Sequence, residues 1–409
     1  MSFESSFSFD ISQKAMASSN FANGVSAEEG NQPVTIPQVD YDSKSGESKL
    51  IVTFFAKDRP PRDILVSDPT GLGGQRLDAA KFENHFTNLL TNLVAPEPLS
   101  LISSLALSRS VFQQAYTASP SFPSPSQLRH DPFISGFEAA NALELVFDLV
   151  PSCPPKPFRP IKLAVFDMDS TLIEEEVIDE LARSIDITDE VSLITARAMN
   201  GEIDFEQSLR ERLALLKGVR ADVWDDLKKK SIHIARGARK LCGVLRERGV
   251  ILAVVSGGFV PMAEWLKEQL GLDYAYANHV RRTRVAWLLS LILNLYLQIP
   301  VSPPTSAHPY PHLSGKPSPD HPIITPERKR HILLSLAAEH SIPLSETLAV
   351  GDGSNDLLML AQAGLGVAFK AKPKVQKRAP QRLNGDSLAD LLFLLGEPDI
   401  KTARTAPAQ

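Results

Sequence analysis

Cysteine is scarce in this chain of 409 residues, where only Cys153 and Cys242 occur. Two cysteines give no disulfide framework, and neither has a Cys/His spacing that suits structural zinc. The scarcity therefore excludes a disulfide-stapled scaffold and a zinc module. It is consistent with a reducing compartment.

A block of lysines and arginines is also missing, and the formal net charge is −5. Nucleic acid and acidic membrane surfaces are bound by basic surfaces, so the sequence argues against both partners. The N-terminus shows no basic start followed by an apolar core, and Glu4 and Asp10 are unlike an arginine-rich transit peptide. We expect a cytoplasmic protein that acts on a small molecule.

Long apolar runs are absent as well. The nearest candidate, residues 287–299, is shorter than the roughly twenty residues that cross a bilayer. Hydrophobic residues nevertheless make up 43 % of the chain, which is enough to bury a sizeable core. We expect a soluble globular protein with one large domain, a smaller domain and no membrane partner.

Composition changes along the chain and suggests its domains. Residues 1–47 lack sustained periodicity and are predicted to form a disordered arm, and the tail 396–409 is predicted to be disordered too. Residues 48–150 contain two β-like runs and are predicted to form a small α+β domain, for which a regulatory role is one hypothesis. Five prolines in residues 151–160 predict a linker.

Residues 161–395 alternate apolar, strand-like runs with stretches of helical periodicity. This alternation predicts the α/β class, with a doubly wound, Rossmann-like parallel sheet. A helical stretch at about 174–236 follows the first strand of this region. We expect it to form an inserted helical cap.

The most informative stretch, residues 166–171, follows the apolar run 163–165. Asp167 and Asp169 place two carboxylates at the end of a predicted buried strand, which is where an open parallel sheet binds its ligands. Phosphoryl chemistry with Mg²⁺ is one interpretation, and a strand exit with a helix N-cap is the other. A calcium loop is excluded, because Leu172 and Ile178 stand where its glycine and its closing glutamate are required.

Two further strand exits carry polar groups. Ser256 and Gly257 follow the run 250–255 and could hold phosphate oxygens near a helix start, with a plain turn as the alternative. Asp352 and Asp356 follow the run 347–350 in a glycine-rich turn, which is either part of a Mg²⁺ site or an ordinary Asp/Asn/Gly turn. Three such exits at one edge of a sheet favour a single site.

Lys329 lies in the first turn of a helix that is predicted to continue through Leu336. Its side chain either turns inward to screen the charge of the carboxylates and a phosphate, or belongs to a solvated run of charges.

Taken in order, these motifs resemble those of the haloacid dehalogenase superfamily. The four motifs are residues 167–171, residues 256–259, Lys329 and residues 351–356. In the cap, residues 176–181 and 205–212, followed by 215–218, resemble the substrate-recognition segments of phosphoserine phosphatases. The resemblance covers about residues 161–395, apart from one interruption.

The resemblance implies Mg²⁺-dependent hydrolysis of O-phospho-L-serine to L-serine and phosphate, the last step of serine biosynthesis. Asp167 would attack phosphorus and form an aspartyl-phosphate, while Asp169 would serve as acid and then as base. Mg²⁺ would be held by Asp167, the backbone carbonyl of Asp169 and Asp352, with Asp356 and Asn355 in support.

The resemblance also implies which residues contact the substrate. Its phosphate would be bound by Ser256, Gly257 and Lys329. In the cap, Glu176 would take the ammonium group and Arg212 the carboxylate, and Phe205 would close over the site. Judged without the resemblance, Glu176 and Arg212 are equally compatible with exposed positions on helices.

One segment departs from the family pattern. After the pair Ala277 and Asn278, the family continues through a short β-hairpin into the lysine motif, whereas here about residues 280–312 add an apolar stretch and a Pro-rich stretch. We interpret this segment as an extraneous insertion, with an in-frame retained intron as the hypothesis. If present, it exposes a large apolar surface.

Two other functions stay open from the sequence. A related phosphatase or phosphotransferase that acts on another small phosphomonoester would pass through the same aspartyl-phosphate. A non-catalytic regulatory or membrane-associated protein is suggested by the apolar insertion and the N-terminal region, but the intact acidic motifs argue against it.

Overall fold

The computed structural model describes residues 48–56, 86–87, 90–91, 99, 101–106, 111–118, 122–140, 143–151, 160–283 and 312–396. The predicted arm, most of the Pro-rich linker and the tail beyond residue 396 lie outside the described residues. Of the helices within these ranges, none is long and apolar enough to cross a membrane.

The N-terminal part of the described chain is an antiparallel sheet with helices. Its strands are β1 (Ser48–Ala56), β2 (Leu101–Ala106), β3 (Val111–Ala118) and β4 (Leu143–Pro151), in the order β2-β3-β1-β4. Helical residues 86–87 and 90–91 lie between β1 and β2, and α2 (Pro125–Arg129) and α3 (Pro132–Ala140) lie between β3 and β4. This order is that of a ferredoxin-like split βαβ arrangement.

The core of this N-terminal part follows from the alternation of side chains along β1. Leu50, Val52 and Phe54 are fully buried and pack in one cluster with Phe86 and Phe147. Successive residues of a strand point to opposite faces, so one face of the sheet supplies this cluster. The predicted small α+β region thus has an apolar core of its own.

The second sheet is parallel and has six strands. These are β5 (Leu163–Phe166), β6 (Ile251–Phe259), β7 (Tyr274–Asn278), β10 (Thr347–Gly351), β11 (Leu365–Phe369) and β12 (Gln381–Leu383). They lie in the order β12-β11-β10-β5-β6-β7. The associated helices are α8 (Ala238–Glu247), α9 (Val260–Leu270), α11 (Pro326–Glu339), α12 (Leu357–Gln362), α13 (Pro373–Arg378) and α14 (Leu391–Leu394).

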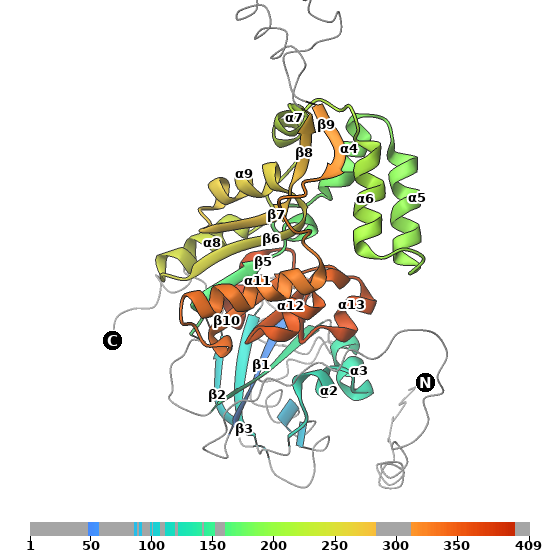
Figure 1. Ribbon diagram of the computed structural model, residues 1–409. Coiled ribbons are helices and arrows are strands. Elements are labelled where there is room, and N and C mark those ends of the chain that lie inside the picture. Colours follow the sequence, from blue (N-terminus) through green and yellow to red (C-terminus); the bar gives the residue numbers. More distant parts are fainter. Residues whose placement is uncertain are drawn as a thin grey trace, which may run out of the picture. The chain divides into compact units, whose positions relative to one another are not determined.

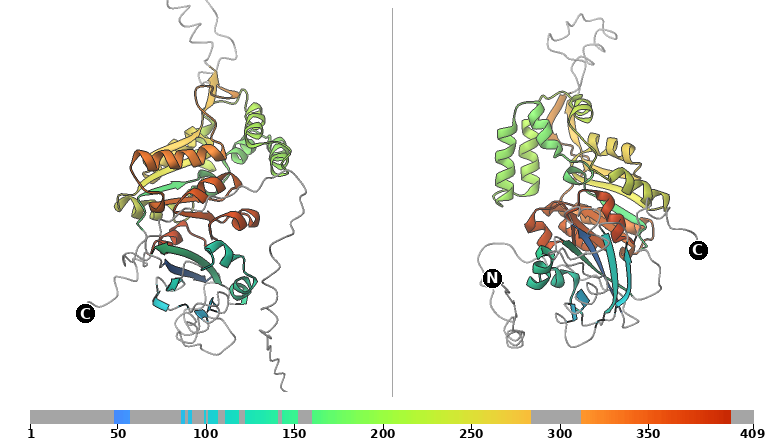
Figure 2. Two further views of the ribbon diagram at one scale, coloured as in Figure 1. Left: turned by 60° about the horizontal axis from the view of Figure 1, so that its bottom comes forward. Right: turned by 180° about the vertical axis from the view of Figure 1, so that it is seen from behind.

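Helices cover both faces of this sheet, as Figures 1 and 2 show. In β5, Ala164 and Phe166 pack in the cluster that contains the buried residues of α8 and α9. Leu163 and Val165 point to the other face and pack with the buried residues of α11 and α12. The predicted doubly wound α/β fold is confirmed.

The cap is inserted between β5 and α8. It contains α4 (Val177–Ser184), α5 (Thr188–Met199), α6 (Phe205–Leu215) and α7 (Val223–Lys230). Its two connections to the sheet run side by side, because Ile173 and Ile234 form an antiparallel bridge and the Glu174 amide donates to His233 O at 3.0 Å. These paired connections join the cap to the core at one place.

A hairpin corrects the predicted limits of the insertion. Strands β8 (Val280–Thr283) and β9 (His312–Pro317) are antiparallel, with Arg282 opposite Leu313 and Thr283 opposite His312. The first residues and the last residue of the predicted segment 280–312 are therefore parts of an ordinary strand pair. The remainder of the predicted insertion, residues 284–311, lies outside the described residues. The hairpin meets the cap where the Leu313 amide donates to Val219 O at 2.8 Å.

The two sheets contact each other through β4 and β12. The Gln381 side chain donates to the carbonyl of Phe147, and Arg382 forms an ion pair with Glu138 at 2.6 Å. The Asn384 amide group donates to Glu144 Oε1 at 2.7 Å. The N-terminal sheet is thus joined to the edge strand of the parallel sheet, and to the residue that follows it, by polar groups of which Gln381, Glu138 and Glu144 are buried.

Candidate active site

Asp167 lies at the centre of the carboxyl edge of the parallel sheet. It follows β5, which pairs with β10 on one side and β6 on the other, and its amide donates to Val350 O at 2.8 Å. One helical turn, Met168–Leu172, comes next, in which Ser170 has the left-handed φ of 52°. This turn brings Asp169 back into the crevice beside Asp167. The three predicted strand exits are therefore neighbours.

The exit from β6 differs from the predicted strand end. The strand continues to Phe259, but its pairing with β7 is interrupted: Val255 lies opposite Tyr276 and Phe259 lies opposite Asn278. Residues 256–258 thus form a bulge, which we call the phosphate turn. A bulge turns backbone groups away from the ladder and re-aims side chains, which suits a site at the rim of a sheet.

The two glycines of the phosphate turn leave room for side chains that come close to them. A Cβ atom at Gly258 would lie 2.9 Å from Asp169 Oδ2, and one at Gly257 would lie 2.9 Å from Phe205 Cζ. Any other residue would push away the carboxylate or the cap. The cap side chain of Phe205 is therefore already in contact with the core at the site.

The third exit, after β10, carries Asp352 and Asp356. The Gly353 amide donates to Asp356 Oδ2 at 3.0 Å, and a Cβ atom at Gly351 would lie 2.4 Å from Asp356 Cγ. This turn holds the Asp356 carboxylate, which has no exposed surface, against the backbone. The Asp352 carboxylate accepts a hydrogen bond of 3.4 Å from Thr171 Oγ1.

Lys329 turns inward, as the functional interpretation required. It lies in the first turn of α11, behind the N-cap Thr325, and its side chain is fully buried. Its Nζ lies 2.7 Å from Asp167 Oδ1 and 2.7 Å from Asp356 Oδ1. The lysine therefore bridges two of the carboxylates, and the solvated charge run is not observed at this position.

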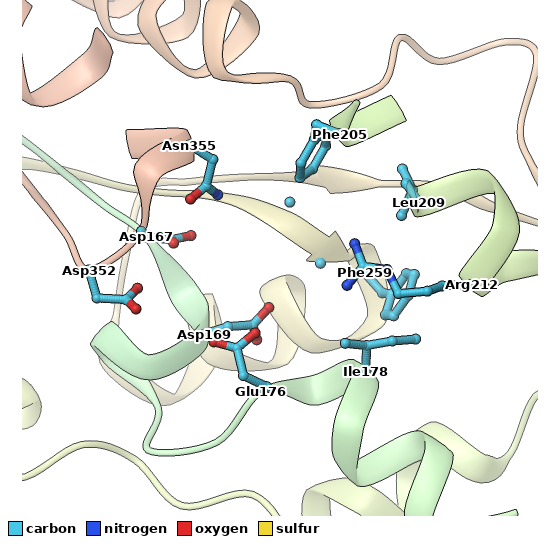
Figure 3. A pocket seen from close by; sticks show the side chains of 13 residues that line it. Asp167, Asp169, Glu176, Ile178, Phe205, Leu209, Arg212, Phe259, Asp352 and Asn355 are labelled. Atoms are coloured by element: carbon cyan, nitrogen blue, oxygen red, sulfur yellow. The ribbon is translucent and has the colours of Figure 1, made fainter. Parts of the chain in front are cut away.

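A cavity of about 120 Å³ lies between these turns and the cap (Figure 3). Of the predicted site residues, those that line it are Asp167, Asp169, Glu176, Phe205, Arg212, Gly257, Asp352 and Asn355. The other three, Ser256, Lys329 and Asp356, are buried and do not line it. The cap thus supplies one carboxylate and one guanidinium to a cavity whose remaining charges come from the core.

Sequence reasoning missed five residues that line the cavity: Ile178, Leu209, Gly258, Phe259 and Gly353. Leu209 had a signal, because Phe205, Leu209 and Arg212 are spaced i, i+4 and i+7 and share one face of α6. Phe259 and the two glycines lie inside the motifs already singled out. Apolar walls beside polar groups are typical of small-molecule sites.

Burial controls the protonation of the carboxyl groups. Burial, reinforced by Asp356, raises the pKa of Asp167 well above its usual value, although Lys329 opposes the shift. Burial and the neighbouring Glu176 likewise raise the pKa of Asp169. Burial, with Asp356 and Glu176, raises the pKa of Asp352 to about 7. A carboxyl whose pKa lies near neutrality can donate and later accept a proton.

Three carboxylates are close enough to share a metal ion. Ligand oxygens of Asp167, Asp352 and Asp356 all lie within 4.8 Å of one another. Asp169 Oδ1 is buried and has no hydrogen-bond partner among the described residues. Several anionic oxygens around one point, with a buried oxygen left unpaired, fit a hard divalent cation. The cluster could therefore hold a metal.

Comparisons with known proteins agree with this geometry. Residues 161–364 match the family of haloacid dehalogenase-like hydrolases. A probable phosphoserine phosphatase from Schizosaccharomyces pombe is 47 % identical over 235 residues, which are 58 % of this chain and 70 % of that protein. This chain belongs to the phosphoserine phosphatase family of haloacid dehalogenase-like hydrolases.

A second phosphoserine phosphatase and a solved hydrolase structure are also similar to this chain. The phosphoserine phosphatase of Saccharomyces cerevisiae is 40 % identical over 238 residues, covering 58 % of this chain and 68 % of that protein. A solved hydrolase of the haloacid dehalogenase family, from Salmonella enterica serovar Typhi, is similar with a TM-score of 0.61 at 25 % identity. The similar part is 85 % of this chain and 98 % of the Salmonella protein. As a member of this family, the chain is a hydrolase.

Proposed function

We propose that this phosphoserine phosphatase family member hydrolyses O-phospho-L-serine to L-serine and phosphate with Mg²⁺, as the last step of serine biosynthesis in the cytoplasm. One observation carries the proposal: a small cavity joins a carboxylate and lysine cluster in the core to one cation and one anion of the cap. Phosphoserine has a phosphate at one end and an ammonium and a carboxylate at the other.

Asp167 is the proposed nucleophile. Its carboxylate oxygen attacks phosphorus, the bond from phosphorus to the serine oxygen breaks, and an aspartyl-phosphate forms. Asp169 gives its proton to the departing serine oxygen, so that serine leaves as a neutral hydroxyl compound. The raised pKa of Asp169 supports this step, because the carboxyl must carry a proton at neutral pH.

Asp169 then acts as the base of the second step. It accepts a proton from a water molecule, whose oxygen attacks phosphorus and breaks the bond to Asp167. Phosphate is released, and both aspartates return to their first protonation states. Asp167 precedes the turn Met168–Leu172, Asp169 lies within it, and both line the cavity. Water enters on the side of phosphorus that serine has left, opposite Asp167, so one carboxyl on that side can serve both steps.

Phosphate oxygens are proposed to bind Ser256, Gly257, Lys329 and Asn355. The Ser256 oxygen already accepts a hydrogen bond of 2.8 Å from the Gly258 amide, so its own hydrogen is available to a phosphate oxygen. The amino-acid end is proposed to bind the cap. Arg212 would take the carboxylate in a two-point contact, and Glu176 the ammonium. Phe205 covers the site from the first residue of α6.

Mg²⁺ is proposed to be held by Asp167, the backbone carbonyl of Asp169, Asp352 and Asp356, with Asn355 beside them. When bound, the ion would offset negative charge on the phosphoryl group. The separation of the three carboxylates supports this assignment.

The test is phosphate release from L-phosphoserine with Mg²⁺. We expect release by the parent chain and none by Asp167→Asn. The matched control is Asp273→Asn. Asp273 precedes β7, does not line the cavity, and accepts a hydrogen bond of 2.8 Å from the Leu252 amide. A parent chain that releases no phosphate would overturn the substrate. Release by Asp167→Asn at the parent rate would overturn the nucleophile.

A further inference from the structure

The bulge in β6 leaves backbone groups of the phosphate turn without partners in the sheet. One of them, the Gly257 carbonyl, accepts a hydrogen bond of 2.7 Å from the side-chain amide of Asn278. Asn278 ends β7 and is 2 % exposed. Buried carbonyl groups need donors, and here a side chain provides what the interrupted ladder cannot.

This hydrogen bond also determines where the next amide points. The carbonyl of Gly257 and the N–H of Gly258 belong to one planar trans peptide and point in opposite directions. The Gly258 N–H donates to Ser256 Oγ at 2.8 Å. The peptide is therefore held at both ends, by Asn278 on one side and by Ser256 on the other. The direction left for the Ser256 hydroxyl hydrogen depends on this arrangement.

The other end of the Asn278 side chain holds the helix that carries Lys329. Asn278 Oδ1 accepts a hydrogen bond of 2.8 Å from the Ile324 amide. Ile324 precedes Thr325, whose hydroxyl oxygen caps α11 by accepting from the Arg328 amide at 3.2 Å. A carbonyl only accepts and a backbone N–H only donates, so the two contacts determine the orientation of the side-chain amide.

We propose that Asn278 is a positioning residue, which holds the phosphate turn and the start of α11 at the spacing that a phosphate group requires. It lines no part of the cavity and acts through Ser256 and Lys329. The inference rests on the proposed function, which assigns those two residues to the phosphate and the cap to the amino-acid end.

The test compares two substitutions of buried polar residues by apolar ones of similar shape. Asn278→Leu removes both hydrogen bonds of Asn278. Its matched control is Thr347→Val, because Thr347 is also buried, donates to Leu344 O at 2.7 Å and accepts from the Gly364 amide at 3.1 Å. Thr347 begins β10, at the end of the strand away from the site.

Binding of inorganic phosphate and of L-serine, each with Mg²⁺ present, is measured by calorimetry on the full chain. We expect Asn278→Leu to weaken phosphate binding about tenfold, or about 1.4 kcal/mol. It should leave L-serine binding unchanged, because serine contacts the cap. Thr347→Val should change neither affinity. If Asn278 only stabilised the fold, its substitution would weaken the binding of phosphate and of L-serine alike.

Unchanged phosphate affinity in Asn278→Leu would overturn the proposal. So would an equal loss of affinity for phosphate and for L-serine in this variant, or an equal loss of phosphate affinity in Asn278→Leu and Thr347→Val. If Asn278→Leu does not fold, Asn278→Asp, measured at a pH at which its carboxyl is ionised, keeps an oxygen that faces Ile324 and offers no donor to Gly257. It should also weaken phosphate binding. Failure of both to fold would assign Asn278 to general stability instead. Because the readout is binding, a parent chain that binds phosphate without hydrolysing phosphoserine would refute the proposed substrate alone.

Discussion

Lys329 offers a direct test of how the buried charges of the site are balanced. Its fully buried ammonium lies 2.7 Å from Asp167 Oδ1 and 2.7 Å from Asp356 Oδ1. Lys329→Met keeps most of the side-chain volume but leaves both carboxylates buried without this cation. Removing one partner of a buried ion pair lowers stability by about 3–5 kcal/mol. We expect the free energy of unfolding of the metal-free protein to fall by about that amount at pH 7.5.

The matched control is Lys230→Met. The ammonium of Lys230 lies 3.0 Å from Asp226 Oδ1, but the two side chains are 71 % and 65 % exposed. Water screens such a pair, so its removal should change the free energy of unfolding by less than about 1 kcal/mol. The two substitutions remove the same chemical group from a similar contact, and they differ in burial.

The pH dependence supplies a second readout. Burial and Asp356 raise the pKa of Asp167, while Lys329 opposes the shift, so loss of the lysine raises this pKa further. A carboxyl with a raised pKa in the folded protein binds its proton more tightly there than in the unfolded chain, which favours the folded state at low pH. This contribution is lost as the pH rises from 3.8, the ordinary pKa of an aspartate, toward the raised pKa of Asp167. The deficit of Lys329→Met should therefore be smaller at pH 5 than at pH 7.5.

Urea unfolding of the parent chain and both variants, in the presence of a chelator at the two pH values, measures these effects. A deficit below about 1 kcal/mol for Lys329→Met at pH 7.5 would refute the reasoning, since that is the range of exposed pairs. An equal deficit at both pH values would refute the assignment of the pH-dependent cost to Asp167.

Three further predictions concern the cap, the metal and the hairpin. Arg212→Lys should raise the KM for L-phosphoserine about tenfold or more through loss of the two-point contact, while hydrolysis of p-nitrophenyl phosphate, which lacks the carboxylate, should be unchanged. Because burial raises the pKa of Asp352 to about 7, the metal-free protein should lose stability as the pH rises from about 4 to 7. Mg²⁺ should consequently raise the melting temperature more at pH 8 than at pH 5, and equal increments would contradict this. Deleting residues 284–311, with Thr283→Asn and His312→Gly, should leave a two-residue Asn-Gly turn between the paired residues Arg282 and Leu313. This shortened variant should keep its activity. If it folds but is inactive, the pairing of β8 with β9 is contradicted.

The carboxylates of the site could be placed from the sequence because of where they stand. Asp167 and Asp352 directly follow apolar strands, and the carboxyl ends of parallel strands meet at one edge of the sheet. Lys329 was harder to place, because burial of its charge depends on two carboxylates that are remote in sequence. Its role was open until the distances to Asp167 and Asp356 were known.

The role of Asn278 and the limits of the hairpin could not be predicted, for a related reason. The function of Asn278 depends on the bulge in β6, and a bulge exists only relative to the neighbouring strand β7. The strand β8 looked like part of an insertion because its partner β9 begins only at His312. Local patterns reveal which residues carry polar groups, but pairing between distant segments decides where those groups lie.

The hydrogen bond between Asn278 Oδ1 and the Ile324 amide closes the base of an excursion of the chain, residues 279–323. A second bond, from the Ser318 amide to His279 O at 2.7 Å, lies just inside it. The excursion therefore leaves and rejoins the core through a stem that is tied twice before the chain reaches β8 and β9. Beyond that stem, β9 is also tied to the cap, where the Leu313 amide donates to Val219 O and the Gly218 amide donates to Leu313 O. The hairpin tip is accordingly a suitable position at which to attach an affinity tag or a fluorescent reporter, and a position at which a gene can acquire extra codons without altering the catalytic strands.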